Sequence, residues 1–182
     1  GEGKGETLFY LTAKTITGTV AWEAFHTLRE NGLKFKVTAI TAKEKLCFLD
    51  SPECNPQECP YARGHFDRIN EAVYELWTTK NHYTRDILQE HARKWQVCPF
   101  EMCLDLSVWV DGVICDYNYA FDPNVHLKRF FGENISGDYI FLIDEAHNLV
   151  ERGREMYSAE ISRQTLFTLR KKIRKHFPKL AR

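Results

Sequence analysis

The alternation of short apolar segments with an amphipathic stretch restricts the fold of this chain more than any other feature. Residues 8–12 are apolar and partly aromatic, which favours a buried strand. Residues 20–28 repeat apolar side chains at helical spacing before the stop signal Asn31-Gly32, and residues 35–40 alternate like a second strand. A strand, a helix and a strand in about 30 residues predict a parallel sheet with a right-handed crossover, and therefore an α/β fold.

Residues 44–106 break this rhythm and are interpreted as an insertion. The segment holds four of the six prolines and five of the six cysteines. Its helical spacing predicts two short amphipathic helices, one with Phe66, Ile69, Val73 and Leu76 on its apolar face, the other with Ile87, Leu88, His91 and Trp95 after a possible Thr84 cap.

The strand pattern resumes after the insertion. Residues 112–115 and 138–143 are strand-like, and a helix is predicted over residues 124–131 between them. A last helix is expected from about Arg163. We therefore expect a sheet domain that begins in residues 1–43 and continues in residues 107–155, the insertion at 44–106, and a separate element at 156–182.

Charge is balanced overall but unevenly distributed. The chain has 25 basic and 25 acidic residues, yet residues 161–182 contain eight Lys or Arg and no Asp or Glu. This tail can follow a phosphate backbone, although charge alone favours a solvated helix face. The apolar runs, such as residues 139–143, are far shorter than the roughly 20 residues of a membrane-spanning helix, so no membrane partner is expected.

The strongest chemical signal is Asp144-Glu145-Ala146-His147, directly after the apolar run at 139–143. Ligands of open α/β sheets bind beyond the carboxyl ends of the strands. Asp144 is expected to hold Mg²⁺ through water, Glu145 to orient and deprotonate the water that attacks a γ-phosphate, and His147 to link this site to its neighbours. An acidic turn without function is the alternative for the Asp-Glu pair.

A phosphate-binding loop is missing from the sequence. Such a loop needs Gly, four residues and then Gly-Lys-Ser/Thr between a strand and a helix, whereas Gly3-Lys4 is followed by Gly5 and preceded by no strand. The nucleotide site is therefore half present, and this chain alone is not expected to hydrolyse ATP.

Four cysteines form a candidate metal site: Cys47, Cys54, Cys59 and Cys98. Zinc sites prefer two close pairs of ligands, and only one interval here is that short. A [4Fe–4S] cluster also takes four thiolates and tolerates irregular spacing. Buried free thiols remain the alternative, and Cys103 remains an alternative fourth ligand.

Taken in order, these motifs resemble the XPD/DinG family of iron–sulfur, superfamily-two DNA helicases with a DEAH box. The resemblance is carried by the Thr-Ala-Lys-Thr stretch at residues 12–15, the inserted cysteines, Cys98-Pro99-Phe100, residues 117–123 and residues 144–148. It implies a partial RecA-like parallel sheet of the P-loop NTPase type, with a mainly helical iron–sulfur insertion and the start of an arch domain at residues 156–182.

The resemblance also implies an activity. A family member hydrolyses Mg-ATP and translocates 5′ to 3′ on single-stranded or fork-like DNA, in repair or replication, together with a phosphate loop and a second motor domain from the rest of the chain. Thr12, Lys14 and Thr15 match the DNA-contacting motif Ia, Asp144, Glu145 and His147 match the ATPase motif, and Cys47, Cys54, Cys59 and Cys98 match the cluster ligands. The role of Tyr117, Asn118 and Tyr119 stays open.

Two other functions compete with an enzyme fragment. The chain could be a stand-alone metal-dependent nucleic-acid-binding module in which Asp144-Glu145 is incidental, or a redox sensor that uses a cluster as a switch. The absence of targeting signals leads us to expect a cytoplasmic, bacterial protein.

Overall fold

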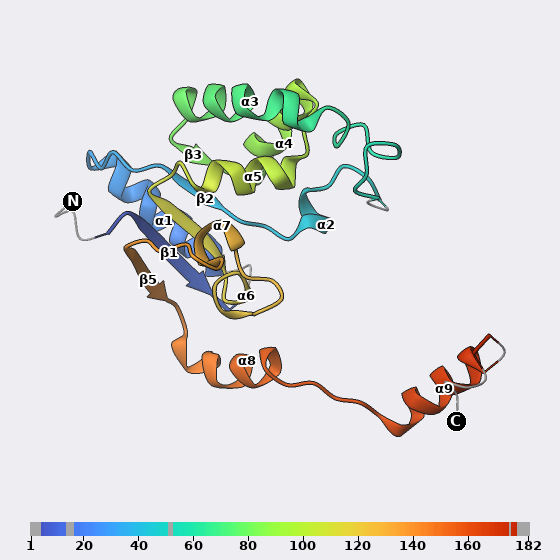
Figure 1. Cartoon of the computed structure of the whole chain (residues 1–182). Helices are drawn as coiled ribbons and strands as arrows, with labels where there is room; N and C mark the ends of the chain where they lie inside the picture. The colour runs from blue at the N-terminus through green and yellow to red at the C-terminus, as the bar shows by residue number, and fades with distance from the viewer. Residues whose placement is uncertain (1–4, 14–16, 51–52, 175, 178–182) are drawn as a thin grey trace.

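The computed structural model describes residues 5–13, 17–50, 53–174 and 176–177. Five strands form one sheet: β1 (Thr7–Thr12), β2 (Val37–Ala39), β3 (His82–Tyr83), β4 (Gly112–Asp116) and β5 (Tyr139–Ile143). Their order is β3-β2-β4-β1-β5, and every neighbouring pair is parallel. The predicted α/β class with a parallel sheet is confirmed (Figure 1).

The helices of the described residues fall in the connections between and after the strands. They are α1 (Thr17–Glu30), α2 (Lys43–Leu46), α3 (His65–Thr79), α4 (Arg85–Trp95), α5 (Pro99–Ser107), α6 (Asn118–Phe121), α7 (Lys128–Phe131), the 3₁₀ turn η1 (Ala146–Asn148), α8 (Leu149–Met156) and α9 (Arg163–Ile173).

The alternating side chains of β1 divide the interior between two faces of the sheet. Leu8 and Tyr10 pack with Ala21 and Phe25 of α1 on one face. Phe9 and Leu11 belong to the larger core on the other face, which also includes apolar residues of α3, α4, α5 and α7. Period-two alternation thus lets a single strand anchor helices on both sides.

The segment at 44–106 joins the sheet as well as interrupting it. Its two-residue strand β3 pairs with β2 at the sheet edge, through Val37 opposite His82 and Thr38 opposite Tyr83. The Lys36 ammonium donates to the backbone carbonyls of Trp77 and Lys80 at the end of α3. A cation at a helix C-terminus is favourable because the last carbonyls carry partial negative charge.

Two local predictions were wrong in part, and one helix was not predicted. The helix expected over residues 124–131 is limited to α7, because the Asp122 side chain accepts from the Asn124 N–H and holds a turn there. Phe66, expected on the buried face of α3, is 86% exposed because it lies in the first turn at the rim of the body. Helix α8 was not foreseen.

The expected last helix exists as α9, capped by Ser162, whose hydroxyl accepts from the Thr165 N–H at 3.1 Å. It lies away from the sheet (Figure 1), and Leu166, Phe167 and Leu169 on it are about half exposed. No helix of the described residues is long and apolar enough to cross a membrane.

Candidate functional site

The Asp144–His147 turn starts where β5 ends. The Asp144 N–H donates to the Leu11 carbonyl at 2.9 Å, which continues the β1–β5 pairing by one residue and fixes Asp144 at the carboxyl edge of the sheet. Asp144 is half-buried, whereas Glu145 and His147 are exposed, with Glu145 Oε2 3.3 Å from His147 Nδ1. The carboxylates therefore stand where parallel sheets bind their ligands.

Glu145 has a left-handed backbone conformation, with φ of +50°. This conformation is unfavourable for a residue with a Cβ, so surrounding contacts have to hold it. The Asn148 N–H donates to the Glu145 carbonyl at 2.9 Å, and the Asn148 side-chain amide donates to it at 3.1 Å. These two hydrogen bonds therefore hold the backbone of the turn at Glu145.

Tyr117 holds the Asp144–His147 turn through hydrogen bonds, a role that its sequence position alone did not reveal. The side chain is fully buried, and its hydroxyl donates to the backbone carbonyls of both Asp144 and Glu145, the latter at 3.0 Å. Burial raises the pKa of the Tyr117 hydroxyl, and the nearby carboxylates of Asp144 and Glu145 raise it further. Tyr117 therefore stays a neutral donor that positions the acidic turn.

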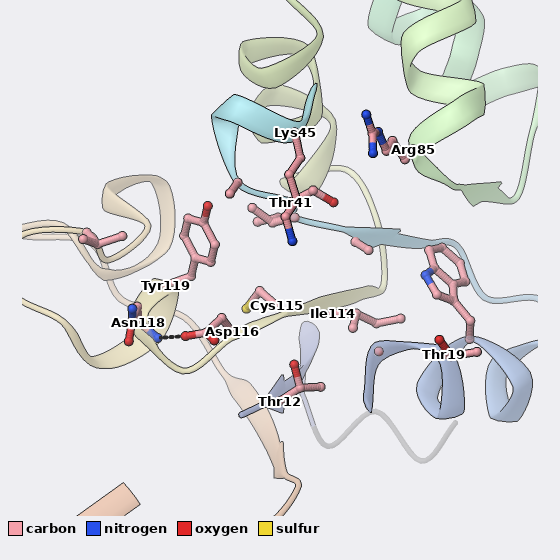
Figure 2. A pocket seen from close by; sticks show the side chains of 16 residues that line it. Thr12, Thr19, Thr41, Lys45, Arg85, Ile114, Cys115, Asp116, Asn118 and Tyr119 are labelled. Atoms are coloured by element: carbon pink, nitrogen blue, oxygen red, sulfur yellow. Dashed lines mark hydrogen bonds between the residues drawn. The ribbon is translucent and has the colours of Figure 1, made fainter. Parts of the chain in front are cut away.

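A cavity of about 390 Å³ opens at the carboxyl ends of β1, β2 and β4, and its lining residues do not include the Asp144–His147 turn. Figure 2 shows Lys45 pointing into it from α2, with Arg85 of α4 at its rim and Asp116 and Asn118 on the opposite side. Thr12, Thr19 and Thr41 add hydroxyl groups to the wall. Lysine, arginine and threonine are groups that bind phosphate oxygens.

Thr12 connects this cavity to the predicted DNA-contacting motif. It ends β1, is 3% exposed and lines the cavity. Lys14 and Thr15, the other two residues of that prediction, lie outside the described residues. The Arg152 guanidinium of α8 lies 3.8 Å from the carboxylate of Asp116, which also lines the cavity.

A second cavity, of about 340 Å³, is lined by all four candidate ligand cysteines. Cys47 follows α2, Cys54 and Cys59 lie in the loop before α3, and Cys98 is the N-cap residue of α5. None of the four is in a disulfide. The fold therefore gathers at one cavity thiols that are up to 51 positions apart in the sequence.

Opposing effects act on the Cys98 thiol, and burial is the largest of them. Burial raises the pKa of the Cys98 thiol, but hydrogen bonds from the backbone N–H groups of Glu101 and Phe100 oppose this effect. The Lys43 ammonium also lies beside the cavity, where a hydrogen bond to Cys54 raises the pKa of Lys43. Helix N-termini and neighbouring cations both favour a thiolate.

Arg68 joins the two chain segments that carry Cys59 and Cys98. Its guanidinium donates to the Arg63 carbonyl at 2.8 Å, to the Trp95 carbonyl at 3.0 Å and to the Gln96 carbonyl at 2.6 Å. The first of these carbonyls follows Cys59 in the chain, and the other two precede Cys98. Arg68 thus fixes the spacing of the two segments.

Cys103 and Cys115 lie apart from the second cavity. The Cys103 thiol is fully buried and is 3.6 Å from the Ala39 carbonyl of β2, so it faces the sheet. Burial raises the pKa of Cys103 to about 12 and also raises that of Cys115. Both behave as buried, protonated thiols, which favours Cys47 over Cys103 as the fourth ligand.

Comparison with known proteins gives the chain a family. The DEAD_2 family model matches residues 34–166, which is most of the chain. The chain belongs to the DEAD_2 family. This DEAD_2 chain is 29% identical over 101 residues to the Fanconi anemia group J protein homolog of Gallus gallus, and 28% identical over 131 residues to the general transcription and DNA repair factor IIH helicase subunit XPD/RAD3 of Saccharomyces cerevisiae.

These alignments cover 56% and 72% of the DEAD_2 chain but only 7% and 16% of the two relatives. Among solved structures, a truncated XPD superposes with a TM-score of 0.60 and 19% identity, covering 99% of this chain and 53% of that one. The predicted resemblance to XPD-like superfamily-two helicases is therefore confirmed, and so is the fold class.

Proposed function

We propose that this DEAD_2 chain is part of the first motor domain of an ATP-dependent 5′-to-3′ DNA helicase that acts in DNA repair or replication. The observation that carries the proposal is the Asp144–His147 turn, held by Tyr117 at the carboxyl edge of a parallel sheet whose strands β1, β2 and β4 end at a cavity lined by cations and hydroxyls. The helicase relative named above supports the same activity.

In this proposal Asp144 and Glu145 serve Mg-ATP. Among the described residues, no three His, Cys, Asp or Glu side chains are grouped so as to hold one ion. Mg²⁺ does not require such a group, because it commonly binds through one or two carboxylates, waters and the phosphates of its substrate. Asp144 would hold Mg²⁺ through water, and Glu145 would orient the attacking water and accept its proton.

The hydrolysis proposal is tested in the longer protein that contains this chain. Glu145→Gln should reduce ATP turnover by about 10²–10⁴-fold while leaving Mg-ATP binding nearly intact, because only the general base is lost. Glu151→Gln is the control, since Glu151 is an exposed residue of α8 paired with Arg154. Normal ATP turnover in Glu145→Gln would mean that Asp144-Glu145 is an acidic turn without catalytic function.

Single-stranded DNA is the proposed partner of the cavity at the carboxyl ends of β1, β2 and β4. Lys45 and Arg85 supply cations and the threonines supply hydroxyl groups, which suit a phosphate backbone and read no bases. Lys45→Gln and Arg85→Gln should each weaken binding and reduce the slope of log affinity against log salt by roughly 0.7. Arg154→Gln on α8 is the charge-matched control, and unchanged slopes would contradict the proposal.

The rest of the helicase chain is the second proposed partner. Strand β5 is the edge of the sheet, and Ile140, Phe141 and Leu142 on it are 38%, 39% and 45% exposed. An apolar edge strand with unpaired backbone groups favours pairing with a further strand. A further strand from the rest of the motor domain would pair with the outer backbone groups of β5.

The second cavity is proposed to hold a [4Fe–4S] cluster through Cys47, Cys54, Cys59 and Cys98. Four thiols outside any disulfide, from three chain segments around one cavity, fit a cluster that binds each thiolate to a different iron. Zinc would instead require all four ligands about 2.3 Å from a single ion. When bound, the cluster supplies a rigid link between these segments.

Anaerobic purification of the 182-residue chain tests this proposal directly. The chain should contain about four iron and four sulfide ions and absorb broadly in the visible range. Iron-free protein with one stoichiometric zinc would instead favour a zinc-dependent nucleic-acid-binding module.

A further inference from the structure

His65 is a buried imidazole with one nitrogen that has no partner. It is 4% exposed and lines the cavity of the four cysteines. Its Nε2 atom is shielded from solvent and makes no hydrogen bond within the described part of the chain. Buried polar side-chain atoms are almost always paired, so an unpaired nitrogen on a residue that lines the cavity calls for a partner.

The other ring nitrogen determines where the proton is. His65 Nδ1 accepts from the backbone N–H of Cys98 at 3.2 Å. A backbone N–H can only donate, so Nδ1 carries no proton and the neutral ring is protonated at Nε2. Burial lowers the pKa of His65, in keeping with a neutral ring. The unpaired atom is therefore a hydrogen-bond donor, without the lone pair that metal ligation requires.

The fold ties His65 to the chain segments of two candidate ligands. The N–H groups of Ala62 and Arg63 each donate to the Cys59 carbonyl at 3.1 Å, and the turn ends at Gly64 with φ of +65°. A Cβ at Gly64 would lie 2.6 Å from an Arg68 nitrogen, so glycine permits the close approach. His65 follows as the first residue of α3 and is tied to Cys98 by its ring.

We propose that His65 donates a hydrogen bond from Nε2 to a sulfur atom of the iron–sulfur cluster and thereby raises the reduction potential of that cluster. This inference rests on the proposed cluster. Reduction adds negative charge to the sulfur acceptors, and a hydrogen bond to a more negative acceptor is stronger. Hydrogen bonds to sulfur are among the features that set cluster potentials, so His65 favours the reduced state.

The test is a redox titration of the anaerobically purified chain, followed by electron paramagnetic resonance. In His65→Phe, which cannot donate, the ratio of reduced to oxidised cluster at a fixed potential should fall about tenfold, equivalent to a decrease of about 59 mV for one electron. His65→Gln can still place a donor near the Nε2 position, so it should keep a potential close to that of the unaltered chain. His91→Phe is the control, because His91 Nε2 already has a partner, the Ala72 carbonyl at 2.8 Å.

A second measurement needs no variant. With ¹⁵N-labelled histidine, pulsed resonance of the reduced cluster should show a weak nitrogen coupling, since His65 is the one histidine among the described residues that line the cavity. A strong coupling would show direct ligation, and no coupling would show no contact; either result overturns the proposal. Equal reduction potentials in His65→Phe and the unaltered chain would also overturn the His65 proposal. An unaltered chain that contains no iron would overturn the cluster proposal, and the His65 proposal with it.

Discussion

Replacing Tyr117 with Phe should uncouple the acidic turn from the sheet beneath it. The substitution removes one hydroxyl and leaves the buried ring in place. The Glu145 carbonyl keeps both donors from Asn148, but no other donor to the Asp144 carbonyl is found among the described residues. One backbone carbonyl therefore loses its partner.

The loss of this one hydrogen bond sets the expected change in the free energy of unfolding. A buried carbonyl left unpaired costs about 1–2 kcal/mol, and in a chain of this size each kcal/mol lowers the melting temperature by about 2–4 °C. The free energy of unfolding should thus fall by about 1–2 kcal/mol. The left-handed conformation of Glu145 also loses a contact that holds it, so Glu145 should reposition.

Two assays separate stability from positioning. Urea unfolding of the 182-residue chain, followed by tryptophan fluorescence, measures the first effect. ATP turnover of the longer protein measures the second, and we expect kcat to fall by roughly 10²-fold with little change in KM. Tyr119→Phe is the matched control, because Tyr119 lines the neighbouring cavity and makes no hydrogen bond to the turn. If the two variants behave alike, Tyr117 does not position the turn.

Three further outcomes are expected. Cys98→Ser should lose its iron whereas Cys103→Ser should keep it, because Cys103 faces β2; iron analysis checks this, and equal loss contradicts it. Arg68→Ala should shorten the lifetime of the cluster in air about tenfold relative to Arg154→Ala, since Arg68 joins the two cysteine segments. Stability should fall between about pH 9 and pH 12, because burial raises the pKa of Cys103 and of Tyr119 to about 12, so that only the unfolded chain ionises there. The slope is about 1.4 kcal/mol per pH unit for each ionising group, and urea titrations that show constant stability would refute it.

Local periodicity was sufficient to predict most of the sheet. The strands around Phe9, Ile114 and Phe141 are short apolar runs, and a run of this kind between turn residues has few alternatives. The failure over residues 124–131 has an equally local cause, because Asp122 accepts from the Asn124 N–H and the turn replaces a helix that apolar spacing alone suggests. Side-chain hydrogen bonds to the backbone compete with helical ones in ways that periodicity does not show.

The sequence by itself determined the parallel α/β class and the place of Asp144 and Glu145 at the end of a strand, because both depend on neighbours within a few residues. Only the tertiary structure decided that Cys47 lines the cavity while Cys103 faces the sheet, and that Tyr117 supports the acidic turn. It also placed the unpaired nitrogen of His65 beside Cys98. These contacts join residues 27 to 65 positions apart, and their distances depend on how helices pack on the sheet, which no local pattern encodes.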